Sequence, residues 1–296
     1  MATVAEWIEG ARPRTLPAAI APVLAGAGVT AFTGSDLAAG AVWLHAVLAL
    51  VVALALQIGV NYYNDFHDGV RGTDHVRVGP VRLVGQGLAA PTAVRAAALV
   101  SLGTAAVVGL VLVALSGAWV LLPVGAAALL AAWGYTGGSR PYGYAGLGEV
   151  FVFVFFGPVA VCGTTLVTGG DVWPLSALAS VAIGLLTVAI LVVNNLRDLG
   201  LDAEAGKHTL AVRLGDGRTR SLFALCLMVA FVLVAWIALT STWWALLGMA
   251  GAIPAVKAAQ EVLEHAYGRG LIPVLQETSL ALLLTGLGLG LGFVIG

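Results

Sequence analysis

Long apolar stretches follow one another along almost the entire chain, separated by short polar connections. Nine of them approach the roughly 17–25 residues that a helix needs to cross the hydrocarbon layer of a membrane. They cover residues 15–33, 43–63, 92–115, 118–135, 149–168, 173–196, 219–240, 242–258 and 277–295. The pattern predicts an all-α, polytopic membrane protein with about nine transmembrane helices.

Composition supports a lipid environment. Hydrophobic residues make up 60% of the 296 residues and charged residues only 10%, whereas soluble domains carry about 25% charged residues. The formal net charge is −1, so no strong overall field attracts nucleic acid. We expect membrane lipid to surround the chain, and no nucleic-acid partner.

The basic residues indicate an orientation in the membrane. With nine spans, one side of the membrane receives the N-terminus and four connections, and all 14 lysines and arginines fall in or near these stretches. The connections on the other side contain Asp36 and Asp171 but no basic residue. The positive-inside rule then predicts a cytoplasmic N-terminus and a C-terminus outside.

A short polar pattern occurs twice. Asn61 and Asp65 end the second predicted span, and Asn194 and Asp198 end the sixth with the same spacing. Because the two copies lie four spans apart, both emerge on the cytoplasmic side. We interpret residues 1–296 as a single transmembrane domain that contains an internal repeat of a four-helix unit.

The repeated pattern carries the chemistry-bearing residues. Asn61, Asp65 and Asp68 share one face of a helix, since they are spaced by four and three residues. Asn194, Asp198 and Asp202 are spaced by four and four. Carboxylates are costly where an apolar helix leaves the membrane, which makes them candidates for a functional site. Asp74, in the connection that follows the first cluster, is a further candidate metal ligand.

Two facing groups of carboxylates repel each other unless cations lie between them. Carboxylate and amide oxygens suit Mg²⁺, which often links protein carboxylates to substrate phosphates. The sequence therefore predicts a site for a Mg²⁺-bound diphosphate, with remaining phosphate oxygens held by Arg82, Arg140, Arg197 and Lys207. Solvated acidic residues at helix ends are the alternative, and the matched spacing of both clusters argues against it.

The acidic clusters resemble the two motifs of the UbiA superfamily of intramembrane aromatic prenyltransferases. Asn64, Asp65 and Asp68 match the motif Asn-Asp-x-x-Asp-x-x-x-Asp, whose last position is Gly72 here, so that Asp74 is the nearest acid. Asp198 and Asp202 match the second motif, Asp-x-x-x-Asp. The likeness extends over essentially the whole chain.

Further stretches resemble the 1,4-dihydroxy-2-naphthoate polyprenyltransferase branch of that superfamily. They cover residues 11–17, 135–138, 141–144, 146–149, 194–198 and 206–210. Many members carry Tyr-x-x-x-Lys in the fourth connection; here Tyr135 is followed by Ser139 four positions later and then by Arg140. The resemblance makes Tyr135 and Arg140 candidates for substrate binding.

The resemblance implies a helical bundle around a central cavity in a bacterial-type plasma membrane. It implies transfer of a polyprenyl group from polyprenyl diphosphate to 1,4-dihydroxy-2-naphthoate, with loss of CO₂ and diphosphate, in menaquinone biosynthesis. Mg²⁺ would be held by the catalytic carboxylates, with Asn61, Asn64 and Asn194 orienting metal or phosphate. The carboxylates are Asp65, Asp68, Asp198 and Asp202.

Two other functions fit parts of the pattern. The same fold acts on other aromatic acceptors, such as 4-hydroxybenzoate, homogentisate or a porphyrin, and acceptor choice depends on details that the motifs do not encode. A cation-coupled transporter is a second alternative, but it would place charges near the middle of the membrane. Here the acidic clusters lie at helix ends, which favours the enzyme.

Overall fold

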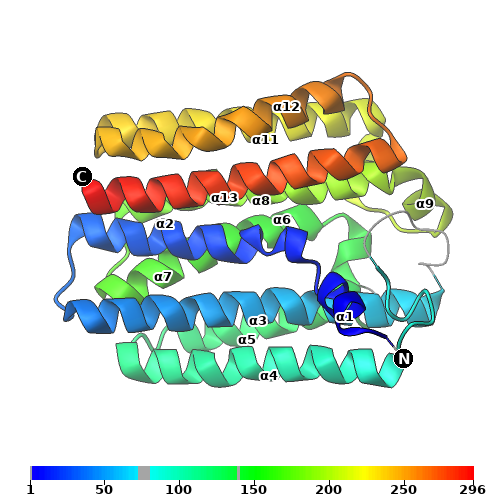
Figure 1. The fold of residues 1–296 in the computed structure, drawn as a ribbon, viewed down its shortest axis with the longest axis horizontal. Helices are drawn as coiled ribbons and strands as arrows, with labels where there is room; N and C mark the ends of the chain where they lie inside the picture. The colour runs from blue at the N-terminus through cyan, green and yellow to red at the C-terminus, as the bar shows by residue number, and fades with distance from the viewer. Residues whose placement is uncertain (1, 73–80, 139–140) are drawn as a thin grey trace.

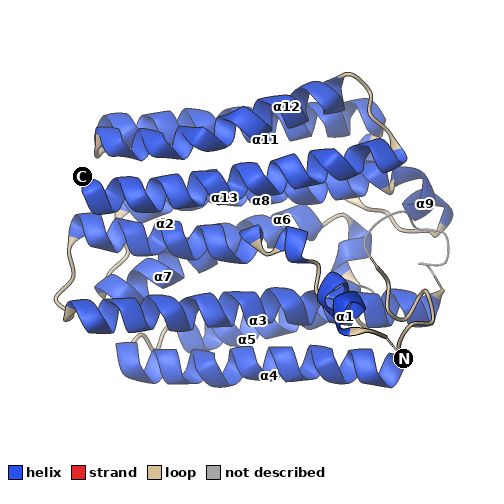
Figure 2. Ribbon diagram, viewed as in Figure 1, coloured by secondary structure: helices blue, strands red, loops and turns tan. Residues whose placement is uncertain are grey.

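The computed structural model describes residues 2–72, 81–138 and 141–296, which form a bundle of long helices lying side by side (Figure 1). Within these residues all regular structure is helical (Figure 2). An all-helical bundle is expected in lipid, because a helix satisfies its backbone hydrogen bonds within its own segment. The predicted all-α membrane fold is confirmed.

The helices follow the chain in a simple order. The N-terminal half supplies α1 (Val4–Gly10), η1 (Pro13–Thr15), α2 (Pro17–Thr33), α3 (Ala39–Arg71), α4 (Pro91–Ser116), α5 (Leu121–Thr136) and η2 (Tyr142–Ala145). The C-terminal half supplies α6 (Gly148–Val154), η3 (Phe155–Val159), α7 (Ala160–Gly169), α8 (Pro174–Arg197), α9 (Leu199–Glu204), α10 (Leu210–Leu214), α11 (Asp216–Thr240), η4 (Trp243–Gly251), α12 (Ala252–Leu263), η5 (Gly268–Gly270) and α13 (Leu271–Ile295).

All nine predicted spans are helical, but they differ in form. In the described chain, seven helices are long and apolar enough to cross a membrane, and an eighth span results if the pair Val4–Thr15 and Pro17–Thr33, bent by 50°, is counted once. The fourth predicted span is α5, whose 16 residues rise only about 24 Å. The fifth contains a π turn at Phe155–Val159 that includes Pro158, which explains the interruption between α6 and α7.

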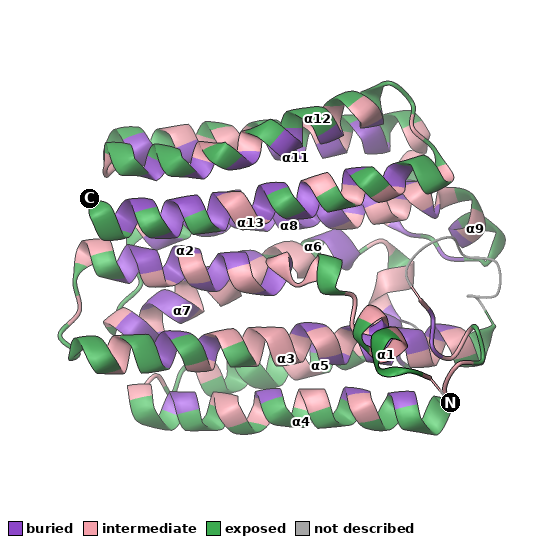
Figure 3. Cartoon of the chain, viewed as in Figure 1, coloured by how far each residue is buried: buried purple, intermediate pink, exposed green. Residues whose placement is uncertain are grey.

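Burial divides the bundle into central and peripheral helices (Figure 3). In α8, 72% of the apolar 18-residue stretch that could span the membrane is buried, compared with 22% of the corresponding stretch in α4. The main hydrophobic cluster is built from α2, α8, α11, α12 and α13 and includes Ile183, Leu186 and Phe223. Exposed apolar side chains on the peripheral helices, such as Leu110 and Val232, are suited to contact with lipid.

Small residues allow α2 and α13 to approach each other closely. A Cβ atom placed on Gly28 of α2 would lie 2.6 Å from the Cα atom of Gly290 in α13. One placed on Gly286 would lie 2.5 Å from the Cβ atom of Ala21. Such small-residue seams are typical of membrane helices, which associate through van der Waals packing.

Exposed tryptophans mark one boundary of the lipid layer. Trp43, Trp119 and Trp243 are 60–69% exposed and Trp173 is 38% exposed. They lie near the start of α3, between α4 and α5, just before α8 and just after α11. These helix ends are on the side of the bundle that carries the C-terminus, opposite to the N-terminus (Figure 1). Indole rings favour the interface between lipid and water, so this end of the bundle corresponds to one membrane surface.

The distance along a helix from these tryptophans to the polar motifs shows how deep in the membrane the motifs lie. The 18 residues from Trp43 to Asn61 rise about 27 Å along α3. The 21 residues from Trp173 to Asn194 rise about 32 Å along α8. Both distances are close to the roughly 30 Å of hydrocarbon in a bilayer, so both motifs begin at the opposite membrane boundary.

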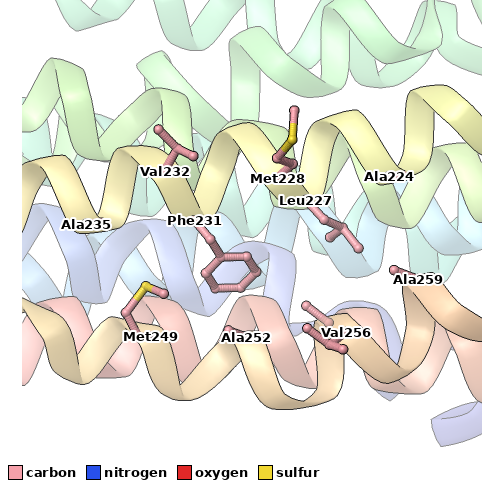
Figure 4. Close-up of a pocket in the computed structure, with 11 residues that line it drawn as sticks. Ala224, Leu227, Met228, Phe231, Val232, Ala235, Met249, Ala252, Val256 and Ala259 are labelled. Carbon is pink, nitrogen blue, oxygen red and sulfur yellow. The ribbon is translucent and has the colours of Figure 1, made fainter.

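An apolar pocket of about 480 Å³ lies between α11 and the η4–α12 segment (Figure 4). Phe231, Met249 and Val256 are among its lining residues, all of which are apolar. Three of the lining residues, Met228, Val232 and Val256, are more than half exposed. The pocket is therefore a groove on the outer surface of the bundle, distinct from the motif-bearing helix ends.

The close packing of α2 on α13 leads to a stability prediction. We expect Gly28→Ala to lower the free energy of unfolding by about 1–3 kcal/mol, because the new methyl group meets the Gly290 backbone. Gly103→Ala is the matched control, since no atom of the described part of the chain lies within 4 Å of a Cβ atom at Gly103. The measurement is denaturant unfolding of both variants in detergent micelles. Equal stability of the two variants would contradict the packing argument.

Candidate functional site

The last turns of α3 bury the polar side chains of the first motif. Asn61, Asn64, Asp65 and Asp68 are each less than 10% exposed. Buried polar groups are costly unless they form hydrogen bonds or ion pairs. The partners of these four side chains therefore determine which segments surround the end of α3.

The two asparagines of this motif bind neighbouring segments. The Asn61 Nδ2 atom donates hydrogen bonds to the Ala11 carbonyl at 2.9 Å and to the Thr15 hydroxyl at 3.0 Å. The Asn64 Oδ1 atom accepts a hydrogen bond from the Thr136 hydroxyl at 2.8 Å. These contacts hold the N-terminal segment and the end of α5 against α3.

Asp65 is directed towards the segment that precedes α4. Its carboxylate accepts hydrogen bonds from the backbone N–H groups of Leu83 at 2.7 Å and Val84 at 3.3 Å. The guanidinium groups of Arg12 and Arg82 also interact with it electrostatically. Asp65 thus combines a charge suited to metal binding with a contact that fixes the start of the residue 81–87 turn.

The second motif is positioned by an interrupted helix. We expected Asn194, Asp198 and Asp202 to form one polar stripe at the end of a helix. Instead, α8 ends at Arg197 and Asp198 (φ −94°, ψ 3°) separates it from α9. The hydrogen bonds from Asp198 N to Asn194 O and from Asp202 N to Asp198 O persist at 3.2 and 2.8 Å, so the spacing survives the interruption.

Lys207 joins the two motifs. Its Nζ atom lies 3.4 Å from Asp68 Oδ1 and 4.0 Å from Asp202 Oδ1, and all three side chains are at most 5% exposed. The backbone N–H of Lys207 also donates to the Asp202 carbonyl at 2.8 Å. One ammonium group is therefore shared by a carboxylate from α3 and a carboxylate from α9, which lie together at one end of the bundle (Figure 1).

Tyr144, in the η2 turn, contacts the same group of charges. Its hydroxyl donates a hydrogen bond to Asp68 Oδ1 at 2.5 Å. Lys207 Nζ lies 4.3 Å from the centre of its ring, and the Arg71 guanidinium carbon lies 5.5 Å from it. Burial, and then the charge of Asp68, raise the pKa of Tyr144, so its hydroxyl stays protonated and remains a donor.

The other predicted binding residues lie around these charges. Arg197 forms two hydrogen bonds of 2.8 Å with the Asp198 carboxylate, and Arg82 is buried beside the turn that binds Asp65. Tyr135 contacts Tyr142 edge to face with ring centres 5.5 Å apart and interacts electrostatically with Asp68 and Asp202. Two further candidates, Asp74 and Arg140, lie outside the described residues.

The donor set suits a metal that also binds substrate. In residues 2–72, 81–138 and 141–296, no group of three or more His, Cys, Asp or Glu side chains is arranged to hold a metal ion by itself. Mg²⁺ typically takes only one or two carboxylates and completes its shell with waters and phosphate oxygens. Asp68 and Asp202, which already face one shared cation, fit this mode of binding.

Sequence reasoning did not identify three residues of this region: Tyr144, Glu149 and Asn195. Glu149 is buried, and its Oε1 atom accepts a hydrogen bond from Asn195 Nδ2 at 2.9 Å. Some signal was present, since all three residues lie in stretches that carry the family resemblance. Their partners, however, are 76 and 46 residues away along the chain, which no local spacing reveals.

Comparisons with known proteins identify relatives of this chain. Residues 19–270 match the UbiA prenyltransferase family. The chain is 54% identical to a 1,4-dihydroxy-2-naphthoate octaprenyltransferase of Mycobacterium tuberculosis, over 97% of this chain and 96% of that protein. It is 36% identical to the Escherichia coli protein of the same name, over 98% and 95%.

Similarity to solved structures supports the fold. A UbiA homologue from Archaeoglobus fulgidus, solved with DMAPP and Mg²⁺, has a TM-score of 0.64 to this chain at 14% identity. The match covers 98% of this chain and 99% of that one. At this identity the likeness concerns the arrangement of the helices alone.

The shared ammonium leads to a second stability prediction. Without metal, we expect Lys207→Met to lower the free energy of unfolding by about 3–5 kcal/mol, because it removes one partner of buried ion pairs. In the double variant that also carries Asp68→Asn, the free energy of unfolding should fall by less than the sum of the losses in the two single variants. The difference should be about 1–3 kcal/mol. Denaturant unfolding in detergent with a chelator measures both effects.

Lys257→Met is the matched control. Lys257 pairs with Glu277 at 2.6 Å but is 59% exposed, so its replacement should cost at most about 1 kcal/mol. Strict additivity of Lys207→Met and Asp68→Asn would show that the two side chains do not interact.

Proposed function

The chain belongs to the UbiA prenyltransferase family, and we propose that it transfers a polyprenyl group from polyprenyl diphosphate to 1,4-dihydroxy-2-naphthoate. The reaction releases diphosphate and CO₂ and yields a demethylmenaquinol, which makes it a step of menaquinone biosynthesis. The relatives named as 1,4-dihydroxy-2-naphthoate octaprenyltransferases, similar over almost their whole length, support this choice of acceptor.

One observation carries the proposal: Asp68 and Asp202, one from each acidic motif, share the ammonium group of Lys207. A pair of carboxylates that face a common cation at the membrane boundary suits a charged headgroup whose tail stays in lipid. A polyprenyl diphosphate has this form. Mg²⁺, when bound, neutralises the diphosphate and makes it a better leaving group.

The residues of the site take separate roles in this proposal. Asp68 and Asp202 would hold Mg²⁺, with Asp65 and Asp198 as neighbouring ligands at the same two helix ends and Asp74 as a further predicted ligand. The amides of Asn61, Asn64 and Asn194 orient these groups. Phosphate oxygens are bound by the basic side chains near both motifs, and Tyr135 lines the space beside them. The basic side chains are Arg82, Arg197 and Lys207, with Arg140 as a further prediction.

Product formation by the purified protein tests the proposal. With 1,4-dihydroxy-2-naphthoate and a polyprenyl diphosphate, we expect prenylated naphthoquinol with Mg²⁺ and none after chelation. Asp68→Asn and Asp202→Asn should each lower kcat/KM at least about 100-fold, since each removes charge that stabilises the departing diphosphate. Asp171→Asn, on an exposed connection at the opposite end of the bundle, should retain full activity.

Other outcomes of the same assay distinguish the alternatives. Turnover with 4-hydroxybenzoate or homogentisate but not with the naphthoate would overturn the acceptor and keep the site. Failure with every aromatic acceptor would overturn prenyl transfer itself.

We also propose that the N-terminus and the motif-bearing helix ends face the cytoplasm of a bacterial plasma membrane. The two termini lie at opposite ends of the bundle (Figure 1), and the basic residues gather at the N-terminal side. Alkaline phosphatase fused after Gly296 should therefore be active, and green fluorescent protein at the same position should be dark. The opposite pair of results would reverse the orientation.

A further inference from the structure

Glu149 is a buried carboxylate that is only partly satisfied. It lies in the first turn of α6 and is 6% exposed. Its Oε1 atom accepts a hydrogen bond from Asn195 at 2.9 Å, whereas its Oε2 atom is buried and has no hydrogen-bond partner among residues 2–72, 81–138 and 141–296. Burying a carboxylate oxygen without a donor is unfavourable, so this position suits a group that gains a donor from a ligand.

The surroundings of Glu149 connect it to the acidic motifs. Its partner Asn195 lies next to Asn194 on α8, three residues before Asp198. The Tyr135 phenol lies beside the start of α6, where a Cβ atom on Gly148 would be 3.8 Å from its hydroxyl oxygen. Tyr135 interacts electrostatically with Glu149 and also with Asp68 and Asp202.

The charge of Glu149 excludes some ligands and favours others. A carboxylate repels a diphosphate, so Glu149 is unsuited to the phosphate end of the donor substrate. For the same reason it favours the hydroxyl group of an aromatic acid over its carboxylate. An aromatic hydroxyl group supplies the missing donor to Oε2 and can transfer its proton to a carboxylate.

We infer that Glu149 binds the hydroxyl group of the aromatic acceptor and takes up its proton during prenyl transfer. This inference rests on the proposed function and identifies a general base for it. Asn195 orients the carboxyl group, and the Tyr135 phenol and the Cys226 thiol are the other titratable groups that interact with it.

The proposed step balances for the naphthoate acceptor. The hydroxyl proton passes to Glu149 as the ring carbon that bears the carboxylate forms a bond with C1 of the prenyl group. The C1–O bond breaks and its electron pair leaves with diphosphate, which gives a ketone next to the carboxylate. The bond to CO₂ then breaks, its electron pair forms the enolate, and the enolate takes the proton back from Glu149.

Glu149→Gln is the discriminating variant. Glutamine keeps the side-chain length and can still accept the hydrogen bond from Asn195, but it cannot take up a proton. We expect kcat/KM for 1,4-dihydroxy-2-naphthoate to fall at least about 100-fold, while the KM for polyprenyl diphosphate stays within about threefold. Glu149→Asp, which keeps a carboxylate, should recover at least about tenfold of this loss.

A series of acceptors with increasingly acidic hydroxyl groups provides a second readout. Acceptors that are already ionised at the assay pH need no base, so the ratio of wild-type to Glu149→Gln rates should approach one along the series. A purely structural role would leave this ratio constant. Binding of polyprenyl diphosphate with Mg²⁺ verifies that each variant is folded, and Glu264→Gln, an exposed position, serves as the matched control.

The outcomes separate this inference from the proposed function. Wild-type activity together with an unchanged Glu149→Gln rate would overturn the role of Glu149 and leave prenyl transfer intact. An equal loss of affinity for the diphosphate would move Glu149 to the donor side and overturn the assignment to the acceptor. Absence of wild-type turnover with every hydroxylated aromatic would overturn the proposed function first.

Discussion

Carboxylates at the edge of a lipid layer require counter-charges and hydrogen-bond donors. This requirement determines the arrangement of the loops at the end of the bundle that carries the two acidic motifs. Asp65 takes two backbone N–H groups from the residue 81–87 turn. Asp68 takes the hydroxyl of Tyr144 and shares Lys207 with Asp202. Each donor belongs to a connection between helices, so the acidic residues that are suited to metal binding also fix the loops around them.

The remainder of the bundle sets where these charges lie. The glycine seam between α2 and α13 permits close packing without large side chains, and α8 is buried through most of its length. The distance along α3 and α8 from exposed tryptophan to first asparagine is about one hydrocarbon thickness. Both motifs therefore reach the same membrane boundary, where a lipid-borne tail and a water-borne headgroup can be bound together.

The sequence was sufficient to predict the helices and the separate polar motifs, because both depend on local periodicity. Asn61 with Asp65 and Asn194 with Asp198 keep their predicted spacing. The interruption at Asp198 was not predicted, because the polar residues continue with helical spacing across it. The backbone hydrogen bonds on either side also follow that spacing. The contacts of Tyr144 and of the Glu149–Asn195 pair were not predicted either. Their contacts join segments far apart in the chain, and only the packing of those segments brings the atoms together.

The shared position of Lys207 has a consequence for how the site gains and loses ligands. Its ammonium group already offsets negative charge on Asp68 and Asp202. Its long, flexible side chain allows the ammonium group to shift by several bond lengths. In the proposed function, a divalent ion bound between these carboxylates would replace the single positive charge of the ammonium group by two. Binding of the metal would then be an ion exchange, in which the strength of the lysine contact affects how readily the incoming ion is held and released.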